Sequence, residues 1–253
     1  MSIKSVLVHL DPKTNATGVL DVALELARQH RAHVFGLWPT AEAGSERSPL
    51  ERAFRERARQ LQLSHEWSRV AGNEAAILVL ASRCHDLLVI GQAEPDADRF
   101  WPQPHHLLER TLLKSGHPLI AVPRGGTFPS IAERILVAWD GAREAARAVE
   151  DAIPILERAK QVTLVTVDLR SGDALSADHL VTLLERHGVH VSVQGARSHG
   201  RAIGEVLLAR ARELDCDLLV MGGYGHSPLR EHLFGGATYF VLGHMDVPVL
   251  LSH

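Results

Sequence analysis

The sequence predicts an α/β fold of two tandem domains, each an open parallel sheet of five strands with helices on both faces. The first reason is an internal repeat. Val6–Asp11 matches Ile135–Asp140, displaced by 129 residues, and Asp86–Gly91 matches Asp217–Gly222, displaced by 131. The second reason is that short apolar runs alternate with amphipathic stretches in each copy, which is typical of βαβ units.

The first copy contains five apolar runs of strand length. They predict strands near 3–10, 32–38, 65–70, 86–90 and 118–122, with helices in the gaps. The segment 123–130 that follows is rich in Pro, Gly, Ser and Thr and is the predicted linker. We therefore expect domains at 1–123 and 134–253.

The second copy repeats the scheme. Its apolar runs predict strands near 134–139, 162–167, 189–194, 217–221 and 247–251. A helix over about 142–159 would place Ala145, Val149, Ile153 and Leu156 on one face. Leucines at helical spacing predict a helix at 177–187, which Gly188 would end, and further helices are expected at about 201–214 and 237–244.

Composition excludes several classes of protein. The 253 residues are 45% hydrophobic and 23% charged, with a formal net charge of −3, so there is no broad basic field for nucleic acid and no reason for membrane attachment. No apolar run is long enough for a membrane span, and a strand pattern begins at the N-terminus where a signal peptide would stand, so we expect a cytoplasmic protein. The two cysteines give no disulfide framework, and the 16 histidines lack the spacing of metal ligands.

A glycine-rich segment follows the apolar run Leu218–Met221. Gly222 and Gly225 are spaced G-x-x-G, and Gly235 follows after nine more residues. Glycines after a buried strand can bring bare N–H groups close to an anion, and the helix expected at 237–244 would add its N-terminal dipole. Anion or nucleotide binding is the favoured interpretation, and a flexible surface loop is the alternative.

An acidic residue ends the first strand of each copy. In the second copy this is Asp140, which would share a crevice with the glycine segment, because the carboxyl ends of parallel strands meet at one edge of the sheet. Its carboxylate could accept hydrogen bonds from a ribose or an adenine amino group. Capping of the following helix is an equally good interpretation.

Together these residues resemble those of a tandem universal stress protein. The resemblance covers nearly the whole chain, most strongly residues 134–253, and implies a Rossmann-like fold related to the adenine nucleotide alpha hydrolases. It implies a site for ATP or another adenine nucleotide, with or without Mg²⁺. By position this site would contain Asp140, Val167, Met221, Gly222, Gly225, His226, Gly235, Gly236, Ala237 and Thr238. The family usually has Ser or Thr directly after the last glycine, where this chain has Gly236, so the hydroxyl contact to phosphate is lost or moved to Thr238.

The first copy has lost the glycine pattern. Glu94 stands at the place of Gly225 in a run with three carboxylates, and His105 and His106 stand near the places of Gly235 and Gly236. Like charge would repel a triphosphate there, so we expect the first copy to bind no ATP, with Asp11 capping the helix that follows. The resemblance also implies pairing of the two domains through 117–122 and 247–251, and a homodimer of the whole chain.

The function expected from the resemblance is a regulatory one: a stress-response protein that binds an adenine nucleotide in its second domain. The sequence has no P-loop pattern and no acidic cluster with clear metal geometry, and it singles out no catalytic residue. A slow ATPase and an interaction scaffold that binds no nucleotide are the alternatives.

Overall fold

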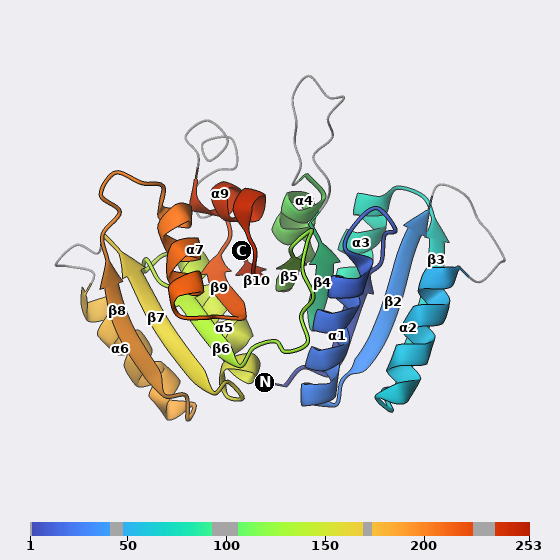
Figure 1. Cartoon of the computed structure of the whole chain (residues 1–253), viewed down its shortest axis with the longest axis horizontal. Coiled ribbons are helices and arrows are strands. Elements are labelled where there is room, and N and C mark those ends of the chain that lie inside the picture. Colours follow the sequence, from blue (N-terminus) through green and yellow to red (C-terminus); the bar gives the residue numbers. More distant parts are fainter. Residues whose placement is uncertain (1, 41–47, 93–105, 169–173, 225–235) are drawn as a thin grey trace, which may run out of the picture. The chain divides into compact units, whose positions relative to one another are not determined.

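The computed structural model describes residues 2–40, 48–92, 106–168, 174–224 and 236–253. The chain divides into two compact domains, an N-terminal domain of residues Ser2–Ile131 and a C-terminal domain of residues Ala132–His253 (Figure 1). The division falls between the two ranges expected from the sequence.

The N-terminal domain alternates strands and helices. Its elements are β1 (Ser5–His9), α1 (Ala16–His30), β2 (His33–Thr40), α2 (Pro49–Gln60), β3 (His65–Ala71), α3 (Glu74–Ser82), β4 (Leu87–Gly91), α4 (His106–Ser115) and β5 (Leu119–Val122). The strand order is β3-β2-β1-β4-β5, and each neighbouring pair is parallel.

The C-terminal domain repeats this topology. Its elements are β6 (Arg134–Ala138), α5 (Arg143–Leu156), β7 (Gln161–Val167), α6 (Ala174–Arg186), β8 (Val191–Ala196), α7 (Ile203–Glu213), β9 (Leu218–Gly222), α9 (Ala237–His244) and β10 (Val249–Ser252). The order β8-β7-β6-β9-β10 is again parallel throughout. The predicted α/β fold with parallel sheets is therefore confirmed.

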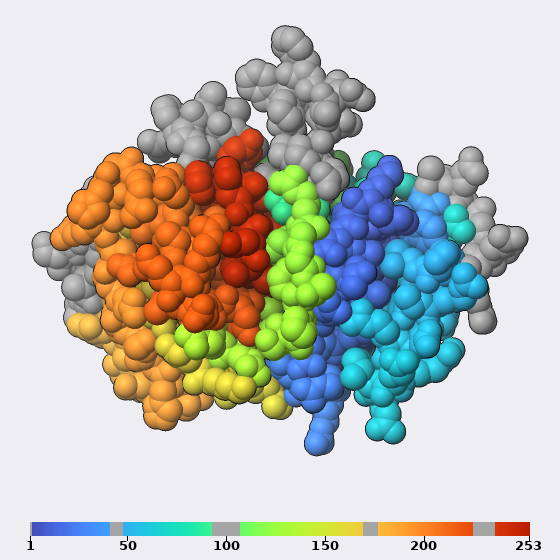
Figure 2. All heavy atoms as spheres, in the orientation of Figure 1, coloured from blue at the N-terminus to red at the C-terminus, as the bar shows by residue number. Residues whose placement is uncertain are grey.

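Helices cover both faces of the C-terminal sheet. Figure 1 shows α7 and α9 on one face and α5 and α6 on the other, and the surface of the α7–α9 face is drawn in orange and red in Figure 2. The two helices α7 and α9 pack closely because Gly204 has no side chain. A Cβ atom there would lie 2.8 Å from the carbonyl oxygen of Ala237 and 3.0 Å from Cβ of Phe240. Gly204 thus allows the start of α9 to lie against α7.

The central strands are buried because their sequences are apolar on both faces. All five residues of β4 are buried, as are the first four of β9. The same anchor precedes both strands. The carboxylate of Asp86 accepts the N–H groups of Lys4 and Ser5, and that of Asp217 accepts those of Glu133 and Arg134. Each acidic residue therefore ties its central strand to the start of the neighbouring one.

The strand predicted at 189–194 is shifted by two residues, since β8 runs from Val191 to Ala196. Gly188 has a positive φ of 75°, and the N–H of Val189 donates to the carbonyl of Leu184. Val189 is only 3% exposed. Val189 is therefore bound to the end of α6 and does not begin the strand.

Within the described residues, no helix is both long and apolar enough to cross a bilayer.

Candidate functional site

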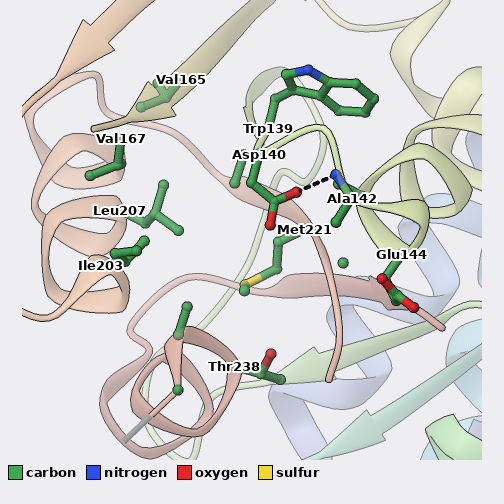
Figure 3. Close-up of a pocket in the computed structure, with 15 residues that line it drawn as sticks. Trp139, Asp140, Ala142, Glu144, Val165, Val167, Ile203, Leu207, Met221 and Thr238 are labelled. Carbon is green, nitrogen blue, oxygen red and sulfur yellow. Dashed lines mark hydrogen bonds between the residues drawn. The ribbon is translucent and has the colours of Figure 1, made fainter. Parts of the chain in front are cut away.

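A pocket of about 340 Å³ lies in the C-terminal domain, where β6, β7 and β9 end and α5, α7 and α9 begin (Figure 3). The strand order reverses between β6 and β9, so the pocket occupies the crevice at which open α/β sheets hold their ligands. The residues that line it are Ala138, Trp139, Asp140, Ala142, Glu144, Ala145, Val165, Val167, Ile203, Leu207, Met221, Gly222, Gly236, Ala237 and Thr238.

One side of the pocket is aliphatic. Figure 3 shows Val165 and Val167, from the end of β7, on the same side as Ile203 and Leu207 of α7, and Met221 of β9 extends toward the middle. A surface of this kind favours an apolar or aromatic group, because contact removes both partners from water.

Asp140 brings a carboxylate into the pocket. Its Oδ1 accepts the backbone N–H of Ala142 at 2.9 Å (Figure 3). The N-cap residue of α5 is Ala142 and not Asp140, so the carboxylate holds the turn before the helix. An ionised carboxylate has acceptor capacity beyond one hydrogen bond, and Asp140 is exposed to the pocket and to solvent.

Three helices begin at the pocket without a side-chain cap. The N-cap residues are Ala142 for α5, Ala202 for α7 and Gly236 for α9, and none of them makes a side-chain hydrogen bond to its helix. The first N–H groups of a helix have no partner within the helix, and they carry the positive end of its dipole. The starts of three helices therefore bring backbone N–H groups to the edge of the pocket.

Two of the corresponding helices of the N-terminal domain, α1 and α3, have a side-chain cap. Asn15 accepts the N–H of Gly18 at 3.1 Å for α1, and Asn73 accepts the N–H of Ala76 at 3.0 Å for α3. The expectation that Asp11 caps α1 is wrong, because Asp11 accepts the N–H of Lys13 at 2.9 Å and Asn15 is the cap. Asp11 thus forms the same turn as Asp140, and the two domains differ in the caps.

A hydrogen-bonded His–Glu pair lies in the N-terminal domain at the positions that correspond to Ala138 and Ile203 of the C-terminal pocket. The residues 129 positions earlier are His9 and Glu74. His9 is 1% exposed, and its Nε2 lies 3.0 Å from Oε1 of Glu74. This hydrogen bond lowers the pKa of Glu74 despite the opposing effect of burial, and the charge of Lys13 adds to the lowering. Polar side chains therefore occupy this place in the N-terminal domain.

Glu144 is a second carboxylate of the pocket, and no sequence pattern marks it. It is 8% exposed and pairs with Arg143, whose Nη2 lies 3.0 Å from Oε1. Its backbone touches the end of β9. A Cβ atom on Gly222 would lie 2.6 Å from the carbonyl carbon of Glu144 and 2.6 Å from the amide nitrogen of Ala145. The absence of a side chain at Gly222 thus allows α5 to begin directly against the strand.

The Thr238 hydroxyl has a structural contact. Its Oγ1 accepts the backbone N–H of Tyr224 at 3.1 Å, in a buried position. Tyr224 has a positive φ of 55°. The hydroxyl therefore helps to hold the chain just after β9, while its proton remains able to be donated.

Seven of the ten predicted site residues line the pocket. They are Asp140, Val167, Met221, Gly222, Gly236, Ala237 and Thr238. The other three, Gly225, His226 and Gly235, lie outside the described residues, as do Glu94 and His105 of the first copy; the side chain of His106 is not described either. No sequence pattern marks Ile203 and Leu207, because only the topology brings α7 to this edge. Within the described residues, no group of three or more His, Cys, Asp or Glu side chains could hold a metal ion.

A protein-family model matches the part of the chain that contains the pocket. A model of the universal stress protein family matches residues 132–253. The C-terminal domain belongs to the universal stress protein family. All of the pocket residues lie within this universal stress protein domain. No curated protein sequence matches the chain.

Solved structures match the chain across both domains. A universal stress protein from Archaeoglobus fulgidus has 16% identity and a TM-score of 0.74, and the alignment covers 99% of this chain and 96% of that one. A putative universal stress protein from Pseudomonas aeruginosa has 18% identity and a TM-score of 0.67, covering 99% and 93%. A functionally unknown protein from the same organism has 17% identity and a TM-score of 0.68, covering 99% and 92%. The tandem arrangement is thus confirmed at the level of the fold.

Proposed function

We propose that the C-terminal domain binds an adenine nucleoside or nucleotide in this pocket, and that the protein acts in a stress response through binding and not through catalysis. The observation that carries the proposal is the set of three helix N-termini without side-chain caps around one cavity. Such N–H groups favour a ligand with acceptor atoms or negative charge.

The remaining lining fits the other parts of such a ligand. The aliphatic side formed by Val165, Val167, Ile203 and Leu207 can receive a planar base. The carboxylate of Asp140 can accept hydrogen bonds from an amino or hydroxyl group. The start of α9 at Gly236 and Ala237 offers N–H groups to a phosphate.

Calorimetric titration of the full chain with adenosine and AMP tests the proposal. Asp140→Ala should weaken binding at least about tenfold, since a hydrogen bond to a charged group contributes about 1.5–3 kcal/mol. Asp11→Ala is the matched control, because Asp11 accepts a backbone N–H at the same distance of 2.9 Å in the other domain. It should leave the affinity unchanged.

Three results would overturn the proposal. They are no binding of either ligand, equal loss in the two variants, or phosphate release from ATP at a rate that Asp140→Ala abolishes. Extraction of the purified protein by denaturation provides an independent check, because a co-purified adenine compound should be found in the extract.

We further propose that the apolar strands β5 and β10 mediate domain pairing and that the chain forms a homodimer. Each of these strands ends the strand order of its own domain, and their sequences, Leu-Ile-Ala-Val and Val-Leu-Leu-Ser, are largely apolar. Light scattering tests the dimer, because a homodimer should have twice the mass of 27.7 kDa of one chain.

A further inference from the structure

We propose that Glu144 makes the C-terminal pocket selective for an adenine nucleoside or nucleoside monophosphate over a triphosphate. This inference rests on the proposed function and names the class of ligand that the site prefers. It assigns a specificity-determining role to a carboxylate that the glycine pattern does not include.

Glu144 is fixed at the place where a chain of phosphates would meet the end of β9. It is the second residue of α5 and is 8% exposed. Gly222 lies against it so closely that a Cβ atom on Gly222 would be 2.9 Å from Cβ of Glu144. The backbone and Cβ of Glu144 are therefore held against the end of β9, and its side chain is part of the pocket lining.

The charge of the described lining is negative. Asp140 and Glu144 are its two ionisable residues, and Figure 3 shows both carboxylates near the start of α5. None of the described lining residues is Lys, Arg or His. Carboxylates accept hydrogen bonds from hydroxyl and amino groups and repel phosphate oxygens. Such a lining favours a ligand rich in donors and poor in negative charge.

The partner of Glu144 neutralises it only in part. The Arg143 side chain is 77% exposed, and both of its contacts are to Oε1, at 3.0 Å from Nη2 and 3.2 Å from Nε. Neither contact engages Oε2. Solvent around the exposed Arg143 weakens its attraction for the carboxylate, so the described lining keeps part of the negative charge of Glu144.

The size of the pocket agrees with a small ligand. Its volume of about 340 Å³ is near the lower end of the range of roughly 300–1,000 Å³ for ligand pockets. The uncapped start of α9 can hold one phosphoryl group. Further phosphates would add negative charge to a described lining that already holds Asp140 and Glu144.

The test measures the affinities of adenosine, AMP and ATP for the full chain by calorimetry at low ionic strength with EDTA. The wild type should bind AMP at least about tenfold more tightly than ATP. Glu144→Gln keeps the shape of the side chain and removes its charge. It should lower the ratio of AMP affinity to ATP affinity at least about tenfold, because ATP should bind more tightly. Adenosine has no phosphate, so its unchanged affinity reports an intact pocket.

Two further variants make the result specific. Arg143→Gln removes the cation beside Glu144 and should raise the ratio of AMP affinity to ATP affinity. Glu150→Gln removes an exposed carboxylate from the same helix, outside the pocket, and should leave the ratio unchanged. If Glu144→Gln does not fold, Arg143→Gln alone tests the inference. The proposal requires this variant to raise the ratio of AMP affinity to ATP affinity, whereas Glu144→Gln should lower it.

The inference is overturned if the AMP-to-ATP ratio is the same in the wild type and Glu144→Gln, or if Arg143→Gln leaves it unchanged. It is also overturned if Mg²⁺ strengthens ATP binding and Glu144→Gln abolishes that gain, because Glu144 would then be a metal ligand. Failure of all three ligands to bind the wild type would instead refute the proposed function. Equal affinities of the wild type for AMP and ATP would overturn the inference and leave the proposed function intact.

Discussion

Gly222 is a packing residue as well as part of the glycine pattern. Gly222→Ala would place a Cβ atom 2.6 Å from two backbone atoms of α5. Because backbone cannot move aside cheaply, we expect a loss of about 1–3 kcal/mol in the free energy of unfolding, measured by urea denaturation. Ligand affinity should fall as well, since α5 lines the pocket.

Gly195→Ala in β8 is the control for this prediction. Nothing lies within 4 Å of a Cβ atom at Gly195, which is exposed. Its effect on stability should stay within about 0.5 kcal/mol. Equal effects of the two substitutions would show that the contact with α5 is unimportant.

The His9–Glu74 pair should make stability depend on pH in the acid range. The hydrogen bond from His9 holds the pKa of Glu74 below its ordinary value of 4.5. A lowered pKa contributes stability that is present above the ordinary value and is lost as the pH falls through the folded value. We therefore expect Glu74→Gln to lower the urea midpoint at pH 7, and the difference from wild type to shrink below pH 4.5.

Glu66→Gln on β3 is the control for the pH dependence, because Glu66 is exposed. It should change the urea midpoint little at either pH. A Glu74→Gln difference that stays constant from pH 7 to pH 3 would contradict the role of the His9–Glu74 hydrogen bond.

Single residues of the site were predictable when a sequence pattern marked them. Asp140 and Gly222 stand out because the repeat and the spacing place them at strand ends. Glu144 was not predictable, because a glutamate in the first turn of a helix is ordinarily exposed and favoured there by the dipole. Its burial follows from the approach of α5 to Gly222, which is a tertiary contact.

At the scale of elements, helix capping distinguishes the two domains. Asn73→Ala should lower the free energy of unfolding by about 1 kcal/mol, because it removes the hydrogen bond to Ala76 at the start of α3. Ala202→Asn at the matching place in α7 should raise stability by a similar amount. It should also weaken adenosine binding about fivefold, because the new side chain would occupy a donor that the ligand uses.

Urea denaturation and calorimetric titration of these two variants check the capping prediction. A stabilised Ala202→Asn variant with unchanged affinity would show that the start of α7 does not contribute to binding. Adenosine affinity should remain unchanged in Asn73→Ala, which alters the other domain.

Most elements could be predicted because apolar runs and helical periodicity are local signals. The two exceptions, the start of β8 and the N-cap of α1, depend on turns and side-chain hydrogen bonds that apolar periodicity does not reveal. Val189 is apolar and looks like the first residue of a strand, but Gly188 turns it back onto α6. Asp11 looks like a helix cap, but Asn15 is closer to the first turn and has taken that role.

At the scale of the whole molecule, the two domains have the same sheet topology but differ in the crevice at the strand ends. Both domains share a strand order and the Asp86 and Asp217 anchors. They differ at the ligand edge, where one domain has the His9–Glu74 pair and the other has Ala138 and Ile203. The topology was predictable from the repeat, whereas this difference required the spatial proximity of β1 and α3.

Transplanting this pair tests whether it explains the difference between the domains. The double variant Ala138→His with Ile203→Glu should fold and lose adenosine binding, because two polar side chains would fill the base-binding side of the pocket. Calorimetry measures the loss, and circular dichroism checks the fold. The single variant Ile203→Val is the control for repacking and should bind adenosine with an affinity close to that of wild type. Undiminished binding by the folded double variant would contradict the account.

The most direct test of the central claim is a crystal structure of the full chain grown with excess AMP. The account predicts density for one AMP per chain, with the base against Val165, Val167 and Leu207, the ribose near Asp140, and the phosphate at the start of α9. An empty C-terminal pocket, or AMP bound beside His9 and Glu74 in the N-terminal domain, would contradict it.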